Sequence, residues 1–92
     1  MNGILIAMPA IAVIEKGIVI RMDIAPREHN PPHIHAERNE EASRFDFEGN
    51  DIDNKFPKQL ARIVSDWIKD YRERLEANWK LSINGERPFR IE

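Results

Sequence analysis

The stretch PKQLARIVSDWIKDYRERLEANWK, from Pro57 to Lys80, decides the fold class of this chain. Its apolar side chains recur every three or four residues, which is the spacing of one face of an α-helix. The pattern predicts one long amphipathic helix that begins at Pro57, because a proline fits the first helical turn, and that ends before Gly85. The apolar face is formed by Leu60, Ile63, Val64, Trp67, Ile68, Tyr71, Leu75 and Trp79.

Upstream of this helix, apolar and polar residues alternate with a period of two, which indicates half-buried strands. Residues 17–25 alternate in this way, and shorter strands are predicted at residues 11–14, 33–38 and 42–48. We therefore expect an α+β fold, with a three- to four-stranded antiparallel sheet packed on one long C-terminal amphipathic helix. The chain should form a single domain over residues 1–92.

The alternation also assigns the two faces of the sheet. The helix should cover the face that carries Ile18, Ile20, Ile34, Phe45 and Phe47. The opposite face should be exposed to solvent and should display Arg21, Asp23, His33, His35, Glu37, Arg44 and Asp46. Residues 1–7 are expected to be an N-terminal extension, and residues 85–92 a tail that packs on the domain or adds to a sheet edge.

The composition narrows the function classes. With a net charge of -2 and a pI near 5.9, the chain lacks the basic character of a non-specific nucleic-acid binder. It contains no cysteine, which excludes disulfides, a thiol nucleophile and a zinc-thiolate site. No apolar run reaches the roughly twenty residues of a membrane span. We expect a cytoplasmic protein.

All three histidines lie in one stretch, EHNPPHIHAE, from Glu28 to Glu37. The prolines restrict the backbone before His33 and so fix the direction in which the next strand starts. Alternate residues of a strand point to the same face, about 6.6 Å apart. His33 and His35 therefore converge on one region, where His29 can join them from the loop.

Two kinds of chemistry suit such a pair. A divalent metal such as zinc would be bound by His33 and His35 with a third ligand, for which His29, Glu37 and Asp46 are the candidates. Alternatively, the two imidazoles act without metal as acid and base in the cleavage of RNA, where a cation stabilises the phosphorane charge. That cation would be Arg21, Arg38 or Arg44, and we take Arg44 as the candidate.

A third interpretation involves no catalysis. In this interpretation the histidines only shape a loop, and the sheet edge or the tail binds a partner protein by strand addition. An exposed sheet edge and the apolar N-terminus also make a homodimer one expectation.

The order of several motifs resembles the bacterial domain-of-unknown-function 4160 family. The HxxPHxHA-type core is matched by His29, Pro32, His33, His35 and Ala36, and the LxANW end of the helix by Leu75, Ala77, Asn78 and Trp79. The resemblance covers the chain from Met8 onward and makes Met8 the family-like start. Residues 49–56, GNDIDNKF, are more polar than the glycine-rich and aliphatic segment of many members.

The resemblance implies a small cytosolic prokaryotic protein. It further implies the toxin-like component of a type II toxin-antitoxin module, because members often lie beside another small domain of unknown function, number 2442. A small antitoxin-like protein would then be the partner, RNA the substrate, and His33 and His35 the catalytic pair.

Overall fold

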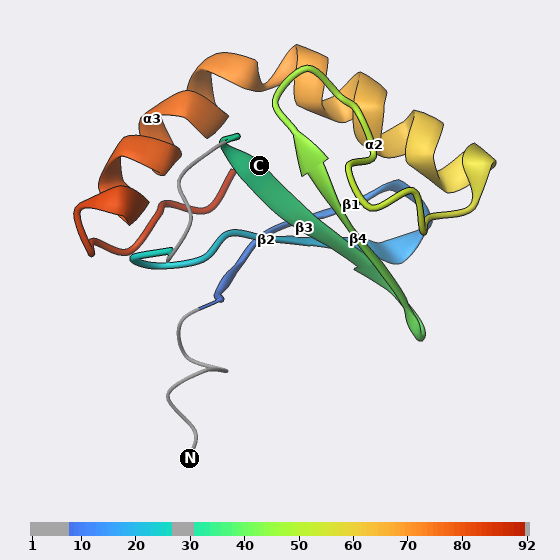
Figure 1. Ribbon diagram of the computed structural model, residues 1–92, viewed down its shortest axis with the longest axis horizontal. Helices are drawn as coiled ribbons and strands as arrows, with labels where there is room; N and C mark the ends of the chain where they lie inside the picture. The colour runs from blue at the N-terminus through green and yellow to red at the C-terminus, as the bar shows by residue number, and fades with distance from the viewer. Residues whose placement is uncertain (1–7, 27–30, 92) are drawn as a thin grey trace.

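The computed structural model describes residues 8–26 and 31–91, and it shows an antiparallel sheet beneath a pair of helices (Figure 1). Within these residues, four strands lie in the spatial order β1-β2-β3-β4, and each pairs antiparallel with the next. The predicted α+β class and antiparallel sheet are confirmed. The strands are β1 (Ala10–Ile14), β2 (Ile18–Arg21), β3 (His33–Arg38) and β4 (Glu41–Asp46).

The first hairpin closes through a short 3-10 turn, η1 (Glu15–Gly17). Lys16 and Gly17 have φ values of 65° and 74° there, in the left-handed region where glycine is the least strained residue. The register then places Ile14 opposite Ile18. This pairing makes residues 15–17 the turn of the hairpin formed by β1 and β2.

The face of the sheet that the helices cover forms the core. Ile18, Ile20, Ile34 and Phe45 have no exposed surface, and Phe47 is almost completely buried. Paired positions such as Ile34 and Phe45 lie on the same face, so their side chains pack side by side. The predicted core face is therefore confirmed.

The prediction of one long helix is wrong. The chain forms α2 (Lys58–Asp70) and α3 (Arg72–Ile83), and between them Tyr71 adopts φ -116° and ψ 20°. The chain bends here without unwinding, because the Tyr71 N–H still reaches the Trp67 carbonyl and the Leu75 N–H reaches the Tyr71 carbonyl, both at 3.0 Å. The bend lets the helices arch over the sheet (Figure 1). Apolar spacing does not reveal it, because the spacing continues through Tyr71.

The C-terminal tail is fastened to the domain by Asn78 of α3. The buried Asn78 amide donates to the Phe89 carbonyl at 2.8 Å and accepts from the Phe89 N–H at 2.9 Å. The Ile91 N–H then donates to the Ile11 carbonyl of β1 at 2.7 Å, and the Ile91 side chain is buried. The tail thus lies against β1, an edge strand of the sheet.

None of the helices in the described ranges combines the length and apolar character needed to cross a membrane.

Candidate metal centre

The sheet register brings polar side chains from three strands together. Arg21 of β2 pairs with His35 of β3, and His35 pairs with Arg44 of β4. Directly paired positions of antiparallel strands point to the same face. His33, two residues before His35, pairs with Asp46. The predicted convergence of His33 and His35 is therefore present, and their ring centroids lie 5.3 Å apart.

Asp23 completes the cluster. β2 ends at Arg21, but continuing its register by two residues would place Asp23 opposite His33. The Asp23 Oδ2 atom lies 3.4 Å from His35 Nε2 and 3.8 Å from His33 Nε2. One potential ligand atom from each of the three residues lies within 4.8 Å of the others.

A strained turn presents Asp23. The strand predicted over residues 17–25 ends early, at Arg21. Ala25 then adopts φ 54°, which interrupts the extended backbone. The Ala25 N–H donates to the Ser82 carbonyl of α3 at 2.8 Å, and the Met22 N–H donates to the Pro9 carbonyl at 3.2 Å. These bonds anchor the turn from both sides of Asp23.

His33 does not face solvent as predicted; only 6% of the residue is exposed. The indole of Trp79, from α3, packs against its ring with centroids 5.3 Å apart. The Pro31 carbonyl lies 3.0 Å from His33 Nδ1. A carbonyl oxygen only accepts, so Nδ1–H is the donor and Nε2 is the nitrogen that faces Asp23. The rigid proline entry therefore fixes the ring as well as the strand.

The members of the cluster shift each other's pKa values. Contact with Asp23 raises the pKa of the His33 imidazole, against the effect of burial, which lowers it. The interactions with His33 and then His35 hold the pKa of Asp23 well below its usual range. Asp23 is thus a carboxylate at neutral pH, and negative charge is present where a cation would be bound.

The other predicted site residues make separate contacts. Glu37 Oε1 lies 3.1 Å from Arg21 Nε in an ion pair. The Asp46 carboxylate accepts the N–H groups of Glu48 and Asn50, both at 2.9 Å. Arg38 Nε donates to the Lys16 carbonyl at 2.7 Å. His29 lies outside the described residues.

Arg44, the candidate catalytic cation, is bound by Asp53. Its Nη2 lies 2.7 Å from Asp53 Oδ1, and its Nε lies 3.1 Å from Oδ2. The Arg44 N–H also donates to Oδ2 at 3.0 Å. The same polar segment supplies Asp51, which bonds to the Ser43 hydroxyl and accepts the Phe56 N–H at 3.0 Å. Residues 49–56 are therefore polar because their carboxylates secure β4.

The geometry of the Asp23–His33–His35 cluster fits a metal ion. Ligand atoms about 2.0–2.1 Å from a tetrahedral zinc ion lie about 3.3–3.4 Å from each other. The observed distances of 3.4 and 3.8 Å from Asp23 Oδ2 are close to that value. Two imidazoles and one carboxylate are also a ligand set of catalytic zinc and non-haem iron, with positions left open for other ligands.

Asp23 was not predicted as a ligand, although the alternation of residues 17–25 placed it on the correct face. The signal that identifies it is the pairing of β2 with β3, since only the register aligns Asp23 with His33 rather than with another residue. Alternation within a single strand does not contain that information.

Comparison with known proteins gives a family and no activity. Residues 17–80 match the model of a family described as a domain of unknown function (DUF4160). The matched region covers most of the chain, so the chain belongs to this family, in agreement with the resemblance of its motifs. No curated protein and no solved structure matches the chain.

Proposed function

We propose that this member of the DUF4160 family binds a divalent transition metal, such as zinc, through Asp23, His33 and His35. The observation that carries the proposal is the open triangle formed by one carboxylate oxygen and two imidazole nitrogens within 4.8 Å of one another. Asp23 takes the place of the third ligand for which His29, Glu37 and Asp46 were the candidates. Glu37 is paired with Arg21, and the Asp46 carboxylate accepts N–H groups of its own turn. His29 lies outside the described residues.

The surroundings of the triangle support this proposal. Metal-bound histidines usually donate their second ring N–H to a carbonyl or carboxylate, which fixes the tautomer and the ring orientation. His33 already has this arrangement, because its Nδ1–H donates to Pro31. Trp79 packs against the same ring and limits its rotation.

A bound zinc ion with three protein ligands would supply an open coordination position for a water molecule or a polarised oxygen of a substrate. The residues of this chain would hold the ion, fix the tautomer of His33 and provide one negative charge. The domain would then be a metal-binding protein or a metalloenzyme, and hydrolysis is the reaction class that such a site suits.

Elemental analysis of purified protein tests the proposal, with Asp23→Asn and Glu37→Gln as a matched pair. Each change removes one carboxylate charge from the same sheet face. We expect near-stoichiometric metal in the wild type and in Glu37→Gln, and little metal in Asp23→Asn or in the double variant His33→Ala, His35→Ala. Metal retained by Asp23→Asn, or absent from all four proteins after reconstitution with zinc, would contradict the proposal.

A second candidate is a metal-free endoribonuclease that acts as the toxin of a toxin-antitoxin pair. It is supported by the contact of Asp23 with both imidazoles, since a carboxylate beside a histidine orients it for proton transfer. Against it, the Arg44 guanidinium is engaged by Asp53. This candidate predicts growth arrest and RNA cleavage on expression, relieved by a small partner protein and abolished by His35→Ala. Normal growth with intact RNA would contradict it.

A further inference from the structure

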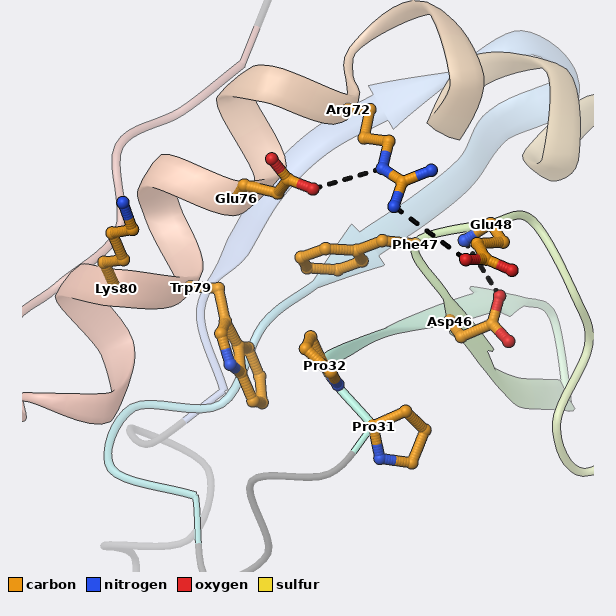
Figure 2. A pocket seen from close by; sticks show the side chains of 9 residues that line it. All are labelled: Pro31, Pro32, Asp46, Phe47, Glu48, Arg72, Glu76, Trp79 and Lys80. Atoms are coloured by element: carbon orange, nitrogen blue, oxygen red, sulfur yellow. Dashed lines mark hydrogen bonds and ion pairs between the residues drawn. The ribbon is translucent and has the colours of Figure 1, made fainter.

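A cleft lies beside Trp79, the residue whose indole packs against His33. It has a volume of about 450 Å³, within the range of about 300–1,000 Å³ that is usual for ligand sites. One face of α3 forms one wall, and the end of β4 with the following turn forms the other (Figure 2). The metal ligands Asp23, His33 and His35 do not line it.

The floor of this cleft is apolar. Trp79 and Phe47 pack edge to face with ring centroids 6.1 Å apart, and Pro31 and Pro32 lie beside them. Figure 2 shows these side chains gathered below Arg72 and Glu76. Such a floor suits the methylene stem of a long side chain, which buries its carbons while its charged head stays near water.

The rim shows which head group fits. Three carboxylates line the cleft, those of Asp46, Glu48 and Glu76, against two cations. One of those cations, Arg72, already lies between two of the carboxylates: its Nε is 3.1 Å from Glu76 and its Nη2 is 3.9 Å from Glu48 (Figure 2). The rim therefore already holds one guanidinium, supplied by the chain itself.

The turn keeps the third carboxylate ionised. Backbone N–H groups of the turn, together with the Asn50 amide, lower the pKa of Asp46 despite its partial burial. The Glu48 carboxylate is exposed and lies 3.9 Å from Arg72 Nη2, a long contact. The wall formed by Asp46 and Glu48 therefore offers carboxylate oxygens to a ligand in the cleft.

We propose that this cleft binds an arginine side chain of a partner polypeptide, with its stem on Trp79 and Phe47 and its guanidinium at the carboxylate rim. Arg72 competes for the same carboxylates and so weakens this binding. The proposal concerns a site separate from the metal centre, and it does not require that a metal binds.

Titration with blocked tripeptides tests the proposal. Acetyl-Gly-Arg-Gly-amide is the probe, and the same peptides with norleucine or glutamate in place of arginine are the neutral and anionic controls. In a Trp67→Phe background Trp79 is the single tryptophan, and its emission reports occupation of the cleft. We expect saturable binding of the arginine peptide and weaker binding of both controls.

Two variants with opposite expected effects sharpen the test. Arg72→Ala should tighten binding of the arginine peptide about two- to fivefold, and Glu76→Gln should weaken it by a similar factor, which is the scale of partly exposed ion pairs. Glu73→Gln is the control, because it makes the same charge change on α3 away from the cleft. Asp23→Asn should bind the peptide like the wild type, which separates this result from metal binding.

The proposal is overturned if the arginine peptide shows no saturable binding, or if the norleucine peptide binds equally well. It is also overturned if Arg72→Ala weakens binding of the arginine peptide, because Arg72 would then support the peptide and not compete with it. Amide chemical shifts of residues 46–48 provide a second readout that does not depend on Trp79.

Discussion

Two clusters on the polar face of the sheet pair basic side chains with a carboxylate, and they differ in how tightly they close. Arg44 and Asp53 form a fork of contacts, the shortest of which is 2.7 Å. Asp23 Oδ2 lies 3.4 Å from His35 Nε2 and 3.8 Å from His33 Nε2. Both distances exceed the roughly 2.7–3.2 Å of a usual N–H···O hydrogen bond. The first cluster is a complete ion pair with a structural role. The second has contacts of the length expected between two ligands of one metal ion.

The largest expected effect is on zinc affinity, which should depend on the Asp23 cluster and not on the Arg44–Asp53 pair. Losing a residue that only orients a ligand costs about 10–100-fold in metal affinity, so losing a ligand should cost more than about 100-fold. We expect this loss for Asp23→Asn when zinc binding is measured by calorimetry. Asp53→Asn should bind zinc like the wild type. Equal losses in the two variants would show that the clusters do not differ in this way.

The second effect concerns the free energy of unfolding without metal. Here we expect the larger loss in Asp53→Asn and the smaller one in Asp23→Asn. Asp53→Asn leaves Arg44 without its bidentate partner and should lower the free energy of unfolding by about 1 kcal/mol, given that the Arg44 side chain is 39% exposed. Asp23→Asn should cost less, although the two imidazoles lower the pKa of Asp23, because its contacts with them are 3.4 and 3.8 Å long. Urea denaturation of the two chelator-treated variants measures both values. A larger loss for Asp23→Asn would mean that Asp23 and its histidines form a structural ion pair.

The third effect is the pH dependence of the Arg44–Asp53 pair. The guanidinium lowers the pKa of Asp53 from 3.8 to about 2. A group whose folded pKa is depressed contributes stability above its unfolded pKa and loses it as the pH falls through the folded value. The wild type should therefore lose about 1 kcal/mol more than Asp53→Asn between pH 4 and pH 2, after allowance for solvent screening. Parallel stability curves for the two proteins over this window would contradict the assignment.

The sequence predicted those features that depend on local spacing. The alternation in β3 placed His33 and His35 on one face, and the apolar stripe of residues 57–80 identified the helical layer. Both follow from periods of two and 3.6 residues, which are properties of a single segment.

Features that depend on two segments were not predicted. The role of Asp23 depends on the register between β2 and β3, and the burial of His33 depends on where Trp79 of α3 docks. The bend at Tyr71 leaves the apolar spacing of the helices unchanged, so the spacing alone does not show it. The polar stretch of residues 49–56 was read as a departure from the family, whereas Asp53 in it secures Arg44.

The smallest expected effect comes from the turns that hold the two carboxylates. Each turn contains a non-glycine residue in the left-handed region: Ala25 at φ 54° near Asp23, and Asn54 at φ 56° beside Asp53. Asparagine tolerates this conformation, whereas the Cβ of alanine is strained in it. We therefore expect Ala25→Gly to raise the free energy of unfolding by about 0.5–1 kcal/mol, while Asn54→Gly changes it by less.

Thermal denaturation of these two glycine variants checks the expectation. The zinc affinity of Ala25→Gly then tests whether the strain at Ala25 affects the metal site. If the strain at Ala25 serves to hold Asp23 in place, relieving it should stabilise the fold and weaken zinc binding together, a pattern typical of strain at functional sites. Stabilisation with unchanged zinc affinity would show that the bonds to Ser82 and Pro9 position Asp23 without help from the strained residue.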